Sequence, residues 1–106
     1  HMTDPMKIRA KLVGDITEIK VLISHPMENG QRKDNAGNTV PPHYIQNLTV
    51  EVGGKMVVSG QTGISISRNP VFGFKLKGAK AGDKVVIRWR DSRGETRADE
   101  TTIVAG

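Results

Sequence analysis

The residues best suited to bind a metal ion gather between positions 25 and 43. His25, Met27, Glu28 and His43 offer nitrogen, thioether and carboxylate groups, which are possible ligands for copper or zinc. Their spacing is not diagnostic, because the two histidines lie far apart in the chain and no HxH or HExxH unit is present. We therefore interpret the histidines as solvated side chains and expect neither a metal nor a cofactor.

Nucleophilic catalysis has one tempting pair, Ser24 beside His25. Adjacent residues on a strand point to opposite faces, so the hydroxyl and the imidazole would be held apart. The acidic pair Asp99-Glu100 lies among threonines on an expected strand, and nothing in the sequence suggests a cleft around it. The chain also has no cysteine, which excludes thiol catalysis, disulfides and thiolate metal sites. We expect a protein that is not an enzyme.

Charged residues concentrate in the stretch SHPMENGQRKD, residues 24–34. It opens a long irregular segment from Pro26 to Pro42, in which several Asn, Gly and Pro residues oppose regular structure. Loops of this length are often functional. The sequence leaves two interpretations open: the charges of Arg32, Lys33 and Asp34 form a recognition surface, or they are ordinary solvated loop residues.

Apolar and polar residues alternate with a period of two along most of the chain, and no run of ten or more residues has helical spacing. This pattern predicts β-strands over residues 6–13, 16–24, 43–52, 55–59, 64–67, 71–77, 84–90 and 95–104. Turn residues separate them. Gly53-Gly54, Ala81-Gly82-Asp83 and Asp91-Ser92-Arg93-Gly94 are expected to close three hairpins.

The alternation also predicts which side chains form the core. The expected core residues are Tyr44, Leu48, Val50, Val52, Phe72, Phe74, Leu76, Val85, Ile87 and Trp89. Many short strands without a covering helix usually stack as two antiparallel sheets. We therefore predict an all-β fold, an immunoglobulin-like antiparallel β-sandwich of about seven or eight strands, with a closed barrel as the main alternative.

The chain of 106 residues fits one domain, expected over residues 6–106. Residues 1–5 are interpreted as a tail in which His1-Met2 is left from an expression tag, since a His precedes the first Met. No secretory signal and no membrane span is visible.

The formal net charge of +5 attracts anionic partners without identifying any. Lys7, Arg9 and Lys11 alternate with apolar residues, which places them on the wet face of a half-buried strand. The chain has four aromatic residues, each on an apolar face, so few rings remain to stack bases. A small basic nucleic-acid-binding β module is kept as the alternative function, although we expect no nucleic-acid partner.

Three stretches together resemble one known family. KIRAKLVGDITEIKVLISHPMENGQRKD, PPHYIQNLTVEVGGK and RNPVFGFKLKGAKAGDKV are similar to the SoxZ family, and the likeness covers nearly the whole chain. The most specific part is the HPMExGQRKD loop with the HYIQN start of the next strand. Departures such as Asn29 fall where family members vary.

The resemblance implies a non-catalytic subunit that forms a heterodimer with SoxY during thiosulfate and sulfur-compound oxidation. SoxY holds the sulfur intermediates on a cysteine of its C-terminal tail, and other Sox enzymes act on that cargo through transient contacts. The family works in the periplasm, and its SoxZ chains are exported with the signal-bearing SoxY. It also implies an immunoglobulin-like sandwich.

For the partner-binding surface we combine the loop with the strand that follows it. His25, Arg32, Lys33 and Asp34 are expected in a recognition surface, with His25 at the exit of its strand. Tyr44 and Ile45 are expected in the SoxY contact, because assigning Tyr44 and Leu48 to the core turns Ile45 outward.

Overall fold

The computed structural model describes residues 3–61 and 66–106. Eight strands make up its regular structure: β1 (Lys7–Val13), β2 (Ile16–Leu22), β3 (Ile45–Val52), β4 (Lys55–Gln61), β5 (Val71–Lys77), β6 (Lys84–Asp91), β7 (Thr96–Thr102) and β8 (Val104–Ala105). No helix among the described residues has the length and apolar character needed to cross a membrane.

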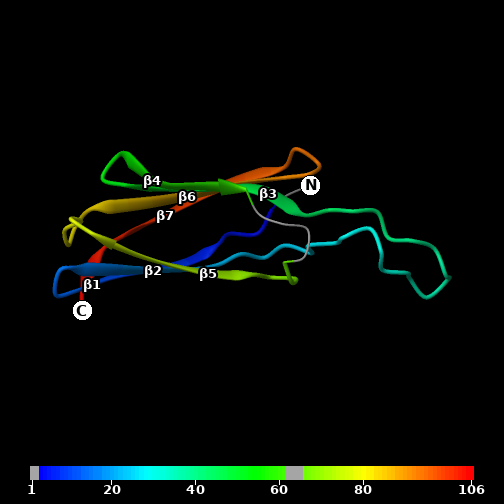
Figure 1. Ribbon diagram of the computed structural model, residues 1–106, viewed down its shortest axis with the longest axis horizontal. Helices are drawn as coiled ribbons and strands as arrows, with labels where there is room; N and C mark the ends of the chain where they lie inside the picture. The colour runs from blue at the N-terminus through cyan, green and yellow to red at the C-terminus, as the bar shows by residue number, and fades with distance from the viewer. Residues whose placement is uncertain (1–2, 62–65) are drawn as a thin grey trace.

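The strands form two four-stranded sheets that stack as two layers (Figure 1). One sheet has the order β5-β2-β1-β8 and the other has the order β4-β3-β6-β7. Every pairing between the longer strands is antiparallel, and the short β8 runs parallel to β1. The predicted immunoglobulin-like β-sandwich is confirmed, and the two separate sheets exclude the closed barrel.

Two of the three expected hairpins are present. Gly53-Gly54 joins β3 to β4 with φ angles of 59° and 81°, the positive values that a tight two-residue hairpin requires. Asp91 to Gly94 joins β6 to β7, which are paired neighbours. The prediction for Ala81-Gly82-Asp83 is wrong, because this turn connects β5 to β6, and these strands belong to different sheets.

The predicted strand over residues 64–67 is not supported where it can be checked. Ile66 and Ser67 are not in a strand, and residues 64 and 65 lie outside the described residues. Asn69 and Pro70, just before β5, hydrogen-bond instead to the segment that follows β2. The Asn69 amide donates to the His25 carbonyl, and the Ile23 amide donates to the Pro70 carbonyl.

The core lies between the two sheets, where most of the predicted residues are buried. Leu48, Val50 and Val52 of β3 are buried together with Val85, Ile87 and Trp89 of β6. Ile19, Val21 and Ile23 cover them from the other sheet. By contrast, the expected core residues of β5 are only half-buried: Phe72, Phe74 and Leu76.

The predicted orientation at the start of β3 is wrong. Ile45 is fully buried, whereas Tyr44 is only half-buried. The pairing of β3 with β6 shifts register between Ile45 and Asn47, so an extra residue interrupts the alternation there. Ile45 and Leu48 therefore face the same core although they lie three positions apart.

Candidate functional site: a buried histidine cluster and the loop that it anchors

Three ionisable side chains from distant parts of the sequence meet at one end of the sandwich. His25 follows β2, His43 precedes β3, and Asp91 is the last residue of β6. All three are buried, and their ligand-type atoms lie within 4.8 Å of one another. Because His25 comes from one sheet and the other two come from the opposite sheet, the cluster joins the two layers.

Asp91 is the centre of this cluster because its two carboxylate oxygens accept four hydrogen bonds. Its Oδ2 lies 3.0 Å from His25 Nε2 and 2.6 Å from His43 Nε2. Its Oδ1 accepts the backbone amides of Arg93 and Glu95, which fixes the β6–β7 turn. Burial alone would raise the pKa of Asp91, but these four hydrogen bonds outweigh it and lower the pKa.

The hydrogen bonds of His25 determine where its proton lies. The Met27 amide donates to His25 Nδ1 at 3.1 Å, so Nδ1 is unprotonated and the neutral ring carries its proton on Nε2. That proton is donated to Asp91. Burial lowers the pKa of His25 below its usual value near 6.5; the bond to Asp91 opposes this change, and nearby His43 adds to it.

His43 lies between two carboxylates. Its Nε2 is 2.6 Å from Asp91 Oδ2 and 3.0 Å from Glu95 Oε1. Ionised carboxylates only accept hydrogen bonds, so this nitrogen carries a proton. The ring also packs edge-on against His25, with centroids 4.6 Å apart, and Trp89 packs edge-on against His25 with centroids 5.2 Å apart.

The cluster has the residue types of a metal site, but its hydrogen bonds favour a different role. A metal at His25 Nε2 requires that nitrogen to lose its proton, and Nδ1 would then have to carry one. The amide of Met27 already donates to Nδ1 and would face that proton. The arrangement therefore suits hydrogen bonding between the two sheets. We call His25, His43 and Asp91 the clamp.

A cavity of about 340 Å³ adjoins the clamp. Its lining includes His25, His43, Trp89, Glu95 and Arg68. The Trp89 Nε1 atom is buried and has no hydrogen-bond partner among the described residues.

The clamp holds the base of the long segment between β2 and β3, which extends away from the sandwich along the long axis of the molecule (Figure 1). The two arms of this loop, residues 26–43, pair with each other. Glu28 and His43 exchange two backbone hydrogen bonds, of 2.7 and 2.9 Å, and Lys33 pairs with Thr39. The predicted irregular loop is therefore a narrow two-armed projection.

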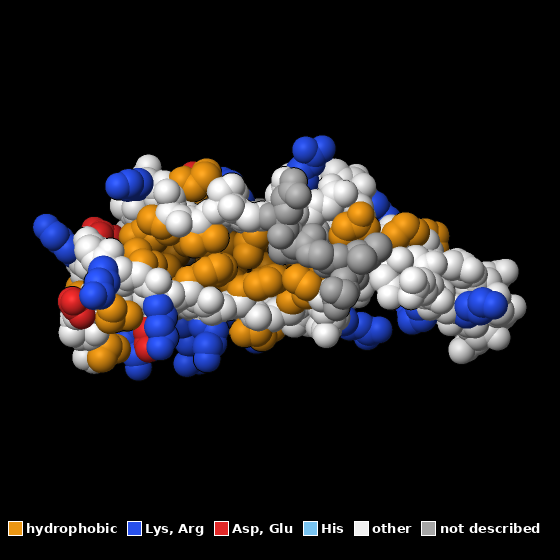
Figure 2. Space-filling view, viewed as in Figure 1, with side chains coloured by type: hydrophobic (Ala, Val, Ile, Leu, Met, Phe, Trp, Pro, Cys, Tyr) orange, Lys and Arg blue, Asp and Glu red, His pale blue; other side chains and the backbone are white. Residues whose placement is uncertain are grey.

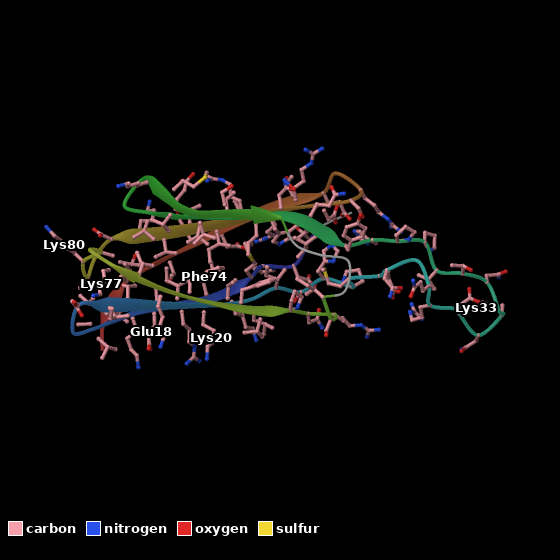
Figure 3. The ribbon with its side chains drawn as sticks, viewed as in Figure 1. Glu18, Lys20, Lys33, Phe74, Lys77 and Lys80 are labelled. Atoms are coloured by element: carbon pink, nitrogen blue, oxygen red, sulfur yellow. The ribbon has the colours of Figure 1, made fainter. Side chains whose placement is uncertain are left out.

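The tip of the projection is a tight turn built by Asp34. Its Oδ1 accepts the amides of Ala36 and Asn38, and its own amide donates to the Asn38 carbonyl. Lys33 lies beside this turn, far from the sandwich (Figure 3).

The two cations on the arms, Arg32 and Lys33, differ in whether an ion pair within the loop already holds them. Arg32 Nε contacts both oxygens of the Glu28 carboxylate, at 2.9 and 3.1 Å. This contact lowers the pKa of Glu28 and raises that of Arg32. Lys33 is exposed, and no ion pair to it appears within residues 3–61 and 66–106. The positive charge at the tip therefore comes mainly from Lys33.

The structure separates the six residues expected to bind a partner. Arg32, Lys33 and Asp34 are exposed on the projection, as a recognition surface requires. His25 is buried in the clamp, and Ile45 is buried in the core, so neither is available to a partner in this conformation. Tyr44 is half-buried at the junction of loop and strand.

The expectation that the two histidines are solvated is wrong, and the carboxylates that join them were missed. Of the four residues considered as metal ligands, His25 and His43 come together, whereas Glu28 pairs with Arg32 and the Met27 sulfur accepts the Ile45 amide. Asp91 and Glu95 had a weaker signal: an Asp opening a DSRG turn at a strand end often accepts backbone amides.

Comparisons with known proteins identify the family. The family profile "Sulphur oxidation protein SoxZ" matches residues 6–102. No curated protein matches the chain.

Several solved structures share the fold. A variant of the superoxide reductase (neelaredoxin) from Ignicoccus hospitalis is 16% identical, with a TM-score of 0.65, and the match covers 98% of this chain and 82% of that one. A superoxide reductase variant from Archaeoglobus fulgidus in the reduced form is 18% identical, with a TM-score of 0.55, over 96% and 87% of the two chains. At these identities the likeness is one of fold. The profile match spans nearly the whole chain, and the chain belongs to the SoxZ family of sulphur oxidation proteins.

Proposed function

We propose that this chain is the non-catalytic subunit of a periplasmic SoxYZ carrier. It pairs with SoxY, which holds covalently bound sulfur intermediates during thiosulfate and sulfur-compound oxidation. In that complex the chain stabilises its partner and offers a recognition surface to the Sox enzymes.

The observation that carries this proposal is the family match over residues 6–102 in a chain without cysteine. A carrier of covalently bound sulfur needs a nucleophilic sulfur atom, and the thiolate of cysteine supplies it in proteins. This chain lacks that group, so the covalent bond must form on the partner. The buried clamp supports a structural role, because its carboxylate is occupied by four hydrogen bonds.

Co-expression with an affinity-tagged SoxY tests the proposal. We expect this chain to co-purify with SoxY through a salt wash, and to be absent from the eluate when SoxY is untagged. Failure to co-purify, with both chains folded, would contradict the proposal.

One observation favours a second function, nucleic-acid binding. The outer face of the β5-β2-β1-β8 sheet carries six cations, Lys7, Arg9, Lys11, Lys20, Lys75 and Lys77, against one acidic residue, Glu18. Charge of this kind supports sequence-independent binding that weakens as salt rises. Within the described part of the chain, no aromatic side chain of this sheet points outward to stack bases, because Phe72 and Phe74 point inward from β5. We therefore place this function second. It would be supported if the protein shifted a labelled oligonucleotide in a gel and the shift weakened as the salt concentration rose.

A further inference from the structure

One long side of the sandwich is open. On the opposite side β7 contacts β1, and the chain passes directly from β7 into β8, which connects the two layers. On the open side the outermost strands are β4 and β5, and each pairs with one neighbour among the described residues. Figure 1 is viewed from this side, with β4 in the upper layer and β5 in the lower one.

The open side exposes part of the hydrophobic core. Phe72, Phe74 and Leu76 point inward from β5 yet are only half-buried, and Val58 faces them from β4. At the next inward position β4 has Gly60, which pairs with Leu48, and an added Cβ there would contact nothing. We call Val58, Phe72, Phe74 and Leu76 the apolar stripe. Figure 2 shows apolar side chains between the layers, and Figure 3 shows Phe74 directed into this space.

Two unpaired strand edges border the apolar stripe. A strand that pairs on one side only leaves backbone N–H and C=O groups unpaired along its other edge, where a strand from another chain can add. Both β4 and β5 are seven residues long, a length of about 23 Å. An added strand of this length would cover the half-buried rings and satisfy the backbone groups together.

We propose that the open side, formed by the edges of β4 and β5 and the apolar stripe, is where SoxY binds, by adding an extended segment. This inference rests on the proposed function, because it assigns the surface through which the heterodimer forms. The segment must be apolar where it meets the stripe and acidic at its flanks.

The charges beside the open side decide between SoxY and a second copy of this chain. Lys75 and Lys77 lie on β5, and Lys55 begins β4. Lys80 follows β5, and Figure 3 labels it together with Lys77. A symmetric dimer through β5 would bring two sets of these lysines together, in a chain that already carries a net charge of +5. An acidic border on a different chain would instead pair with them.

The test uses two valines with the same exposure at opposite edges of one sheet. Val71 on β5 and Val104 on β8 are each 58% exposed, so replacing either leaves the core unchanged. Binding of immobilised SoxY would be measured by surface plasmon resonance for the wild type, Val71→Glu and Val104→Glu. We expect Val71→Glu to weaken SoxY binding at least tenfold, and Val104→Glu to bind within twofold of the wild type.

A second variant probes the apolar stripe itself. Phe74→Gln removes a half-buried ring, and thermal unfolding would show whether this variant folds. If it does not fold, the result for Val71→Glu alone decides. If the wild type binds SoxY and Val71→Glu binds it equally well, the inference is overturned, although the pairing with SoxY stands. Absence of wild-type binding would instead overturn the proposed function.

Discussion

Asp91 is the residue on which the end of the sandwich depends. A buried carboxylate is costly unless its oxygens are fully hydrogen-bonded. Here two imidazoles and two backbone amides supply the donors, and they come from both sheets. These hydrogen bonds therefore offset the cost of burying the Asp91 charge. They also fix the β6–β7 turn and hold the base of the projecting loop.

Asp91→Asn is expected to destabilise the fold by about 3 kcal/mol. An asparagine keeps only one acceptor oxygen, so its NH2 group must face donors on one side: either the two imidazoles or the amides of Arg93 and Glu95. The Met27 amide prevents the His25 ring from relieving this conflict by moving its proton to Nδ1. Urea denaturation would measure the change in free energy of unfolding. Asp99→Asn is the control: Asp99 is bound by Arg97 at a partly exposed site, and we expect a loss of about 1 kcal/mol or less. Equal losses for both variants would contradict the role of Asp91.

Acidification should weaken the fold through His25. Because its pKa is lower in the folded protein than the usual value near 6.5, the unfolded chain binds a proton more readily. The stability due to neutral His25 is therefore complete above pH 6.5 and is lost as the pH falls through the folded pKa. Asp91 and Asp99 also have lowered pKa values, but they lose their contribution below their usual value near 3.8.

The pH effect can be isolated by comparison with His25→Asn. We expect the urea midpoint of the wild type to fall between pH 6.5 and 5, and that of the variant to change less over the same range. A wild-type midpoint that stays constant or rises on acidification would exclude a neutral, buried His25.

From the sequence, the residues with functional side chains can be predicted better than the residues that they contact in the fold. His25 and His43 were singled out by chemistry, but their common partner Asp91 lies 66 and 48 positions away in the chain, respectively. That proximity follows from the stacking of two sheets, which periodicity alone does not define. The exposed loop charges were predictable because they need no tertiary contact.

Among the elements, β3 shows how one extra residue changes an interface prediction. The bulge near its start turns Ile45 into the core and leaves Tyr44 at the margin. Strict alternation assigns these two residues the other way round. A bulge has no dependable sequence signature, so this error could not be avoided from the pattern.

Substitutions at Ile45 should therefore report on folding. Ile45→Val is expected to cost about 1 kcal/mol, the usual result of removing one buried methylene. Ile45→Asp should prevent folding, because it buries a charge in the core. Circular dichroism and urea denaturation would show both effects. A folded Ile45→Asp protein that loses only SoxY binding would restore Ile45 to the interface.

The projecting loop makes a separate prediction about association. Lys33 lies near its tip, whereas Arg32 is held by Glu28, so Lys33→Glu should change long-range attraction more than local structure. We expect a severalfold slower association with an acidic Sox enzyme at low salt, measured by stopped-flow fluorescence on the assembled complex. Lys84→Glu, at the start of β6 and away from both the loop and the open side, gives the matched change of charge. The same slowing in both variants would assign the effect to net charge.

Over the whole molecule, the sandwich was predictable and its open side was not. Period-two alternation and the absence of helical runs were enough to predict stacked antiparallel sheets. Which strands lie at the edges depends on the order β5-β2-β1-β8 and β4-β3-β6-β7, and this order is set by tertiary pairing. Phe72, Phe74 and Leu76 therefore appeared to be ordinary core residues until the neighbouring edge was known.

The whole molecule also separates three surfaces with different chemistry. The projecting loop carries a charged tip, the outer face of the β5-β2-β1-β8 sheet is cationic, and the open side is apolar. Separate surfaces of this kind suit the proposed role, in which the chain holds one partner and presents it to others.

Native mass spectrometry of the chain co-expressed with SoxY tests the central claim most directly. The account predicts one species whose mass is the sum of one copy of each chain, dissociating without a reducing agent, because this chain has no cysteine for a disulfide. Separate chains, or complexes that contain only copies of this chain, would contradict it.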